Sequence, residues 1–208
     1  MLICGGGILG LSVAWALRSL GFQGQVDLIA RHDHQDEWAR RLGADEVLRL
    51  PRRPGGRYER IAERTGGRVR TALFGARALD GGYDLVFECT GASGQIEEAL
   101  RWARSRGQVV LVGTGHGRGA DLTAAWFAEL DVRGASGRAV EHFGDEPAET
   151  YAVAHRFMLR DADVLGGLLT HTFPLARYKD ALRTALDKRT QRSVKVAFRF
   201  DDAPGGGR

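Results

Sequence analysis

The sequence predicts an α/β fold, in which a parallel six-stranded sheet is doubly wound, with helices on both faces, and a C-terminal α/β extension follows. Three observations predict it. Short apolar runs alternate with amphipathic stretches at short intervals. The strand candidates are continuously apolar, which is typical of parallel strands buried on both faces. A glycine-rich turn joins the first strand to the first helix. We expect residues 1–138 to form the sheet domain and residues 139–208 the extension.

The elements follow from the apolar runs and the residues that end them. The predicted strands of the sheet are Leu2–Cys4, Val26–Ala30, Glu46–Leu50, Tyr83–Cys89, Gln108–Val112 and Asp131–Ala135. The predicted helices are Ile8–Leu20, Gln35–Leu42 with Asp33 as its N-cap, a short helix near Arg57–Arg64, Gly94–Arg106 ended by Gly107, and a helix from the Asp121 cap to Leu130. Residues 70–82 form an extra segment without an assigned role.

The extension has a different pattern. Pro147 suits the first position of a helix that runs to about Leu159, and Arg177–Lys188 is amphipathic. Apolar residues then alternate with others, as in a half-buried strand, at Val194, Val196, Phe198 and Phe200. This half of the chain therefore predicts an extension of helices and one strand.

Composition excludes several classes of protein. Apolar residues make up 43% and charged residues 27%, so the chain has a core and is not disordered. The net charge is +4, yet residues 49–70 hold eight arginines against two glutamates. We interpret this basic segment as a solvated helix and loop, and expect no nucleic-acid partner.

Cysteine and histidine spacing predicts no metal site. Cys4 and Cys89 each lie within an apolar run, and no C-x-x-C occurs, so two reduced buried thiols in a cytoplasmic protein are expected. The six histidines have neither H-E-x-x-H nor paired-cysteine spacing. Residues 1–17 are uncharged, but the stretch lacks a basic start and ends at Arg18, so we expect neither a signal peptide nor a membrane partner.

The run Gly5-Gly6-Gly7-Ile8-Leu9-Gly10 matches G-x-G-x-x-G between a strand and a helix, with a second strand about twenty residues on. Gly5 permits the tight turn, Gly7 lets the backbone approach a pyrophosphate, and Gly10 lets the helix pack close to the strand. The helix N-terminus offers N–H groups to phosphates. This context predicts a Rossmann dinucleotide site, and a glycine turn without a ligand is the alternative.

The end of the second strand favours NADP(H) over NAD(H). An acidic residue there usually binds the ribose 2′-hydroxyl, but this chain has Ala30-Arg31-His32. No carboxylate would repel a 2′-phosphate, and the Arg31 guanidinium is able to bind one, with His32 and His34 nearby. The alternative is that Arg31 only faces solvent and Asp33 binds the ribose, in which case NAD would be the cofactor.

The nicotinamide half of the cofactor is expected on the other side of the glycine loop. Two later strands end in small residues, Cys89-Thr90-Gly91 and Val112-Gly113-Thr114-Gly115. Ligands of open α/β sheets bind beyond the carboxyl ends of the strands. Each segment, taken alone, is equally a turn between a strand and a helix.

With these motifs in order, the chain resembles the C-terminal half of zinc-type medium-chain dehydrogenases/reductases, the alcohol dehydrogenase superfamily. The resemblance is carried by LICGGGILGL, ARRLGADEV, YDLVFECTG, RGQVVLVGTG and LLTHTFPLARYKDAL…SVKVAFRF. It implies a nicotinamide cofactor and hydride transfer with an alcohol or polyol. It also implies pairing of two chains into a homodimer through the edge of the sixth strand, Asp131–Gly137.

The resemblance assigns cofactor-binding roles residue by residue. Those expected at the pyrophosphate are Gly5, Gly7, Ile8, Leu9 and Gly10, with Lys195 as a basic residue near the phosphates. Those expected at the adenosine ribose are Ala30, Arg31 and His32. Those expected on the nicotinamide side are Cys89, Thr90, Val112, Gly113, Thr114 and Ala135.

The departure from the family is also informative. The catalytic zinc and its ligands belong to an N-terminal GroES-like domain that this sequence does not contain, and residues 139–208 would return to that domain. We therefore expect no catalytic residue and no metal ligand here, and an inactive isolated chain. The alternative is a non-catalytic NAD(P)-binding sensor or one subunit of a split enzyme. No Tyr-x-x-x-Lys occurs, which argues against a short-chain dehydrogenase.

Overall fold

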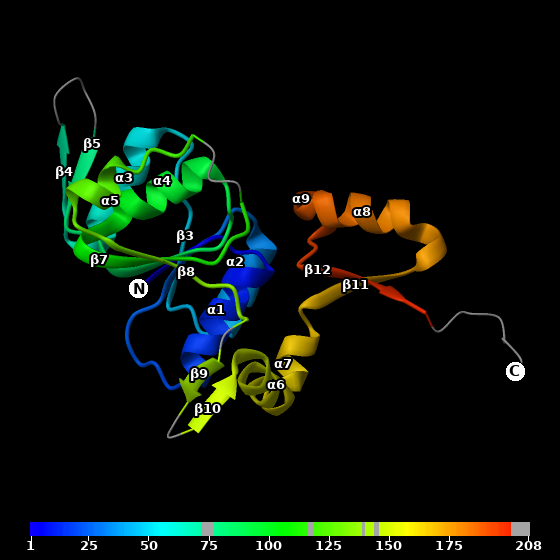
Figure 1. The fold of residues 1–208 in the computed structure, drawn as a ribbon. Coiled ribbons are helices and arrows are strands. Elements are labelled where there is room, and N and C mark those ends of the chain that lie inside the picture. The colour runs from blue at the N-terminus through cyan, green and yellow to red at the C-terminus, as the bar shows by residue number, and fades with distance from the viewer. Residues whose placement is uncertain (72–76, 116–118, 139, 144–145, 201–208) are drawn as a thin grey trace, which may run out of the picture. The chain divides into compact units, whose positions relative to one another are not determined.

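The computed structural model describes residues 1–71, 77–115, 119–138, 140–143 and 146–200. The chain divides into two compact units, Met1–Ser136 and Gly137–Arg208. Each unit is described here by itself (Figure 1). No helix in the described ranges is both long and apolar enough to cross a membrane.

The first unit contains the predicted parallel sheet. Its strand order is β3-β2-β1-β6-β7-β8, and every neighbouring pair is parallel. The strands are β1 (Leu2–Cys4), β2 (Asp27–Ile29), β3 (Glu46–Leu48), β6 (Tyr83–Glu88), β7 (Ala103–Leu111) and β8 (Asp131–Gly134). The predicted fold class is therefore confirmed.

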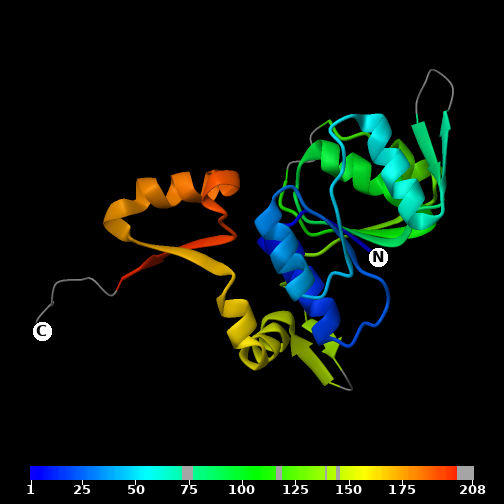
Figure 2. The ribbon, with the colours of Figure 1, turned by 180° about the vertical axis from the view of Figure 1, so that it is seen from behind.

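Helices cover both faces of this sheet (Figures 1 and 2). On one side lie α1 (Ile8–Ser19) and α2 (Asp33–Arg41), and on the other lie α3 (Pro54–Thr65), α4 (Ser93–Trp102) and α5 (Thr123–Phe127). Leu2 and Cys4 pack in one cluster with Ile61 of α3 and Leu100 of α4, all almost fully buried. Burying one such leucine stabilises the fold by about 1.5–3 kcal/mol. Two covered faces explain why the strands are apolar at consecutive positions.

Three predicted helices in this unit have wrong boundaries. The helix predicted from the Asp121 cap to Leu130 is α5, which has Leu122 as its N-cap and ends at Phe127. The N-cap of α2 is His32, and Asp33 is the first helical residue. The helix predicted over Gly94–Arg106 ends at Trp102, and Ala103 already belongs to β7, where it pairs with Tyr83. Arg106, with φ 60°, lies within β7. Pairing in the sheet overrides the helical propensity of this polar stretch, because local propensity is a weak preference.

An antiparallel hairpin occupies the extra segment before β6. It pairs β4 (Arg68–Thr71) with β5 (Arg77–Asp80), and Leu79 of β5 packs against the core cluster. The sequence did not predict these strands. Half of their residues are charged, so the period-2 apolar signal is weak.

The second unit consists of small sheets and short helices. Its elements are β9 (Val140–Phe143), β10 (Glu146–Glu149), α6 (Thr150–Arg160), α7 (Ala162–Gly166), β11 (Leu169–Pro174), η2 (Leu175–Arg177), α8 (Tyr178–Leu186), α9 (Lys188–Gln191) and β12 (Lys195–Arg199). The parallel pair β11–β12 is covered by α8, which buries Ala181 and Thr184. The buried Ser193 hydroxyl donates to the Thr184 carbonyl at 2.7 Å.

The predicted helix start at Pro147 is wrong. Pro147 lies in β10, opposite His142 of the antiparallel partner β9, and α6 begins three residues later at Thr150. Proline is tolerated in strands at sheet edges, and both strands of a two-stranded sheet are edges. The strand predicted from alternation near the C-terminus is present as β12.

Candidate functional site

The carboxyl ends of four strands form one edge of the first unit. β1 lies at the centre and pairs with β2 on one side and β6 on the other. The chain connection reverses direction at this point, which is where open α/β sheets bind their ligands. The segments that leave this edge are Gly5–Gly7, Ala30–His32, Cys89–Gly91 and Val112–Gly115.

The glycine loop after β1 is closely packed. Gly5 has φ +114°, which favours glycine, and a Cβ there would lie 2.8 Å from Thr90 Cγ2. A Cβ at Gly10 would lie 1.9 Å from the Gly5 carbonyl oxygen. Both contacts require glycine at the positions where the sequence pattern places it.

The N-terminus of α1 opens directly onto this loop. Gly7 is its N-cap, with extended backbone, and no acidic residue lies in the first turn. The first N–H groups of a helix lack partners within the helix, so those of Ile8, Leu9 and Gly10 remain available to an anion. This geometry fits a pyrophosphate, the role that the sequence predicted for these residues.

The residues after β2 are held by a side chain that sequence reasoning missed. Gln35 is buried, and its Oε1 accepts hydrogen bonds from the N–H groups of Arg31 (2.9 Å) and His32 (3.1 Å). Ala30 is buried, and a Cβ at Gly6 would lie 3.2 Å from the Ala30 Cβ. The Arg31 segment is therefore fixed against the glycine loop.

The side chain of Arg31 is exposed and forms no ion pair with any described residue. Asp33 is instead engaged elsewhere, because Arg49 Nη2 lies 2.9 Å from Asp33 Oδ1 and 2.8 Å from Asp36 Oδ2. The stacked rings of His32 and His34 lie beside this segment, with centroids 5.6 Å apart. Because the Asp33 side chain is 92% exposed, its ion pair with Arg49 is a weak surface contact.

Glu88, the last residue of β6, organises the loop that follows it. Its side chain is fully buried and accepts hydrogen bonds from the Thr90 N–H (2.7 Å), the Thr90 hydroxyl and the Gly91 N–H (2.9 Å). Its carbonyl accepts from the N–H groups of Val112 and Gly113, both at 2.8 Å. Sequence reasoning missed Glu88, although an acidic residue inside an apolar strand is an unusual signal.

The loops after β6 and β7 touch each other through glycines. A Cβ at Gly113 would lie 2.3 Å from the Gly91 nitrogen, and one at Gly115 would lie 1.7 Å from the Gly91 oxygen. The N–H of Ala135, after β8, donates to the Leu111 carbonyl at 3.0 Å. The structure thus brings Cys89, Thr90, Val112, Gly113, Thr114 and Ala135 to one sheet edge.

Lys195 belongs to the second unit. It lies exposed on β12, and its N–H donates to the Leu168 carbonyl at 3.1 Å. Its expected place near the phosphates remains a prediction.

The two thiols do not have the character of zinc ligands, which bind as thiolates. Burial raises the pKa of Cys4 well above its usual value. Burial and the neighbouring Glu88 raise the pKa of Cys89 to about 12. Over the described ranges, no group of three or more His, Cys, Asp or Glu side chains is arranged to hold a metal ion. The described residues therefore do not fit a zinc centre.

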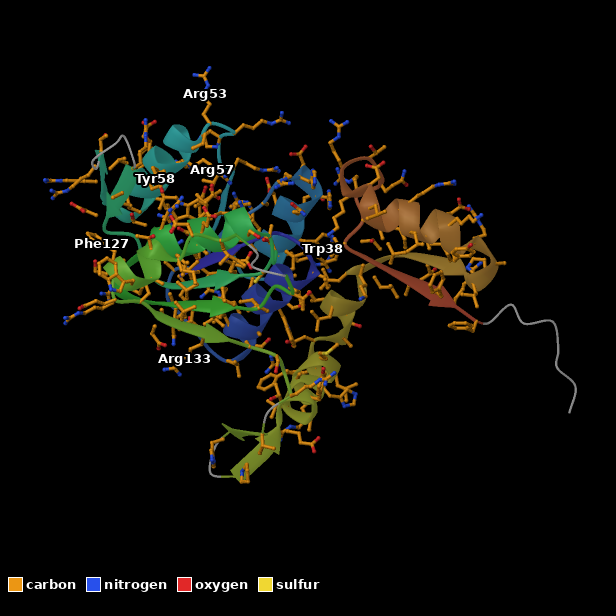
Figure 3. All side chains as sticks on the ribbon, turned by 45° about the horizontal axis from the view of Figure 1, so that its top comes forward. Trp38, Arg53, Arg57, Tyr58, Phe127 and Arg133 are labelled. Atoms are coloured by element: carbon orange, nitrogen blue, oxygen red, sulfur yellow. The ribbon has the colours of Figure 1, made fainter. Side chains whose placement is uncertain are left out.

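The basic segment 49–70 is largely neutralised by acidic neighbours. Five of its eight arginines pair with carboxylates, as Arg49–Asp36, Arg57–Glu98, Arg60–Glu63, Arg64–Asp27 and Arg70–Asp80. Arg53 extends away from the unit into solvent (Figure 3). This pairing supports the interpretation of a solvated helix and loop.

Comparisons with known proteins agree with this geometry. The family model described as zinc-binding dehydrogenase matches residues 9–158. Sorbitol dehydrogenase of Arabidopsis thaliana is 26% identical over 204 residues, covering 95% of this chain and 49% of the relative. Human sorbitol dehydrogenase is 25% identical over 184 residues, covering 88% and 45%. The chain spans about half the length of these curated relatives.

Solved structures share the fold. L-idonate 5-dehydrogenase from Escherichia coli has a TM-score of 0.66 at 22% identity, over 96% of this chain and 49% of the other. A zinc-binding dehydrogenase from Sinorhizobium meliloti bound to NADP has 0.63 at 20%, over 95% and 52%. A protein described as a short chain alcohol dehydrogenase from Escherichia coli, complexed with NADH, has 0.66 at 19%, over 96% and 51%.

Proposed function

Because the chain belongs to the zinc-binding dehydrogenase family, we propose that it is the NADP(H)-binding half of an oxidoreductase that acts on alcohols or polyols. Two of its relatives are sorbitol dehydrogenases, and one structural neighbour is L-idonate 5-dehydrogenase. The cofactor, when bound, supplies the hydride chemistry at its nicotinamide ring. The residues of this chain bind and orient the cofactor.

The glycine loop and the start of α1 would hold the pyrophosphate. Gly5 and Gly10 bring the loop, the helix and β1 into contact, so the backbone of Gly7 lies against the site without a side chain between them. The N–H groups of the first turn then point to the phosphate oxygens. No acidic residue in that turn opposes the negative charge.

The observation that carries the choice of NADP(H) is Arg31. Its backbone is fixed by Gln35, its side chain is exposed, and no described carboxylate neutralises it. A guanidinium forms strong paired hydrogen bonds with a phosphate. Neighbouring structures carry either NADP or NADH, so they leave this choice to the residues of the chain itself.

The nicotinamide side would be formed by the segments after β6, β7 and β8. Thr90 is exposed beside the glycine loop, and the glycines after β7 leave backbone groups uncovered at the sheet edge. We assign these segments a binding role and no catalytic residue. Substrate and metal would be held by a catalytic domain, to which the second unit would return.

Calorimetry on the full 208-residue chain tests the proposal. The chain is titrated with NADPH and with NADH at the same low salt concentration. We expect tighter binding of NADPH, and Arg31→Ala should weaken NADPH roughly tenfold or more while changing NADH little, since hydrogen bonds to charged groups contribute about 1.5–3 kcal/mol.

A matched control removes a different exposed arginine. Arg68 lies on β4 and, like Arg31, has no acidic partner in the described ranges, so Arg68→Ala changes the net charge equally. It should leave the preference for NADPH intact. Tighter binding of NADH to the wild-type chain would refute the role of Arg31. A folded chain that binds neither dinucleotide would refute the proposed function.

The alternative is a cofactor-binding sensor or one subunit of a split enzyme, either of which would use the same glycine loop and sheet edge. Alcohol oxidation assays with NADP⁺ distinguish the dehydrogenase half from a sensor. The dehydrogenase-half proposal predicts no turnover by this chain alone and turnover when a zinc-bearing partner domain is supplied.

We also propose a homodimer through the edge of β8. Among the described strands, β8 pairs with β7 alone, and all four of its residues are exposed. Trp126 and Phe127 of the neighbouring α5 are 80% and 76% exposed, and Figure 3 shows Phe127 and Arg133 projecting outward. An open edge with apolar neighbours readily pairs with another strand. Sedimentation should give a dimer that Val132→Pro, which removes an N–H from the edge, converts to monomer.

A further inference from the structure

A buried carboxylate lies beneath the nicotinamide side of the sheet edge. The Glu88 side chain has no exposed surface, and it is paired in register with Cys4 of β1. Its hydrogen bonds hold Thr90 and Gly91, and Thr90 in turn contacts the glycine loop. Glu88 therefore lies on the far side of β1 from Arg31, since β2 and β6 flank β1 on opposite sides.

The hydrogen-bond pattern identifies Glu88 as ionised. The N–H groups of Thr90 and Gly91 are obligatory donors to its two oxygens. The Thr90 hydroxyl accepts from the Ala92 N–H at 3.2 Å, which directs its own proton to Glu88. A set of hydrogen-bond donors suits a carboxylate, which only accepts. The same negative charge contributes to the raised pKa values of Cys4 and Cys89.

This charge has no cation beside it. No lysine or arginine in the described part of the chain forms an ion pair with Glu88. A buried charge without a counter-charge is costly, even when hydrogen bonds satisfy its oxygens. A positive charge brought close to the loop after β6 would therefore be stabilised there.

We propose that Glu88 makes this site prefer the oxidised form of its cofactor. The inference rests on the proposed function, which places the nicotinamide ring on this side of the edge. The oxidised ring carries a positive charge and the reduced ring is neutral, so the Glu88 charge attracts only the oxidised form. The hydrogen bonds to Thr90 and Gly91 serve both forms equally.

The Glu88→Gln variant separates the effect of the side chain's charge on cofactor affinity from the effect of its shape. The amide keeps the length of the side chain but loses the negative charge, and its NH₂ group opposes one of the N–H donors. Both affinities should fall because the loop loosens. The ratio of oxidised to reduced affinity should also fall, by roughly fivefold to tenfold, because only the oxidised form loses a charge interaction. A purely structural role would leave this ratio unchanged.

The experiment is calorimetry on the full chain with four ligands: NADP⁺, NADPH, NAD⁺ and NADH. The affinity of the oxidised form is divided by that of the reduced form, once for NADP⁺ and NADPH and once for NAD⁺ and NADH. Because both members of a pair have the same 2′ group, the ratio does not depend on the 2′-phosphate. The matched control is Glu88→Asp, which keeps the charge but shortens the side chain. It should lower both affinities and keep the ratio near that of the wild type.

The outcomes are distinct. Two results would overturn the role of Glu88 and leave the proposed function standing. In one, a folded Glu88→Gln chain keeps the wild-type ratio of oxidised to reduced affinity. In the other, Glu88→Asp lowers this ratio as much as Glu88→Gln does. A wild-type chain that binds none of the four ligands overturns both. If Glu88→Gln does not fold, Thr90→Val decides: removing the hydroxyl donor leaves the carboxylate less compensated, so the ratio should rise, and an unchanged or lower ratio overturns the inference.

Discussion

The two units of this chain are built from the same kinds of element but differ in how completely they bury them. In Met1–Ser136 a six-stranded sheet is covered on both faces, and residues such as Leu2, Leu28 and Val109 have no exposed surface. In Gly137–Arg208 the sheets have two strands each, and Leu182 and Leu186 of α8 are 55% and 85% exposed. A two-stranded sheet with a single covering helix buries less apolar surface than a six-stranded sheet covered on both faces, so it is stabilised less.

This difference in burial indicates that the first unit is the more stable part of the chain. The candidate site lies in the first unit, at the edge of a sheet that buries its own core. The described elements of the second unit leave more apolar surface exposed, so we expect it to be the less stable of the two units. Unfolding of the full chain in urea should therefore show two transitions, with the second unit unfolding first.

The largest expected effect is in the glycine loop. Gly10→Val places side-chain atoms where even a Cβ would lie 1.9 Å from the Gly5 oxygen. We expect the first unit to lose more than about 4 kcal/mol of stability, with loss of dinucleotide binding. Gly94→Ala is the control, because a Cβ there has open space and alanine favours the helix α4. Normal urea unfolding of Gly10→Val would contradict the close packing.

The next effect concerns a buried ionic network at the opposite end of the strands. Asp27 is buried; its Oδ2 accepts from the Tyr83 hydroxyl (2.7 Å), and its Oδ1 accepts from Arg64 (2.9 Å). Asp27→Ala should lower the free energy of unfolding of the first unit by about 3 kcal/mol, because Arg64 and Tyr83 lose their buried partner. Ser193→Ala, in the second unit, should cost about 1 kcal/mol and shift only that transition.

The smaller effect is a pH dependence confined to the first unit, which contains both cysteines. The pKa of Cys89 is raised to about 12 in the folded chain, against about 8.5 when unfolded. Above pH ~8.5 only the unfolded chain loses this proton, so stability falls as the pH rises towards 12. Between pH 8 and pH 10 the loss should be about 2 kcal/mol for this thiol.

Comparing Cys89→Ser with the wild type isolates the contribution of the Cys89 thiol to this pH dependence. The variant should lose less stability than the wild type between the two pH values, whereas the second unit's transition should be unaffected by the substitution. Equal pH slopes for the two proteins, measured by urea unfolding, would show that Cys89 titrates normally in the folded chain.

The sequence alone determined the parallel sheet, the order of strands and helices along the chain, the glycine turn and the family. These follow from local signals: continuous apolar runs, glycine at positions with positive φ or close contacts, and motifs in a fixed order. Gly5 and Gly10 are examples, because the geometry they need is set by neighbours in the same strand–turn–helix segment.

Only the tertiary structure decided what depends on distant residues. Pairing with Tyr83 turned Ala103 into a strand residue, and pairing of β10 with β9 placed Pro147 in a hairpin. Contacts across the fold gave Gln35 and Glu88 their roles at the site, since each side chain holds a loop through hydrogen bonds that spacing in the sequence does not reveal.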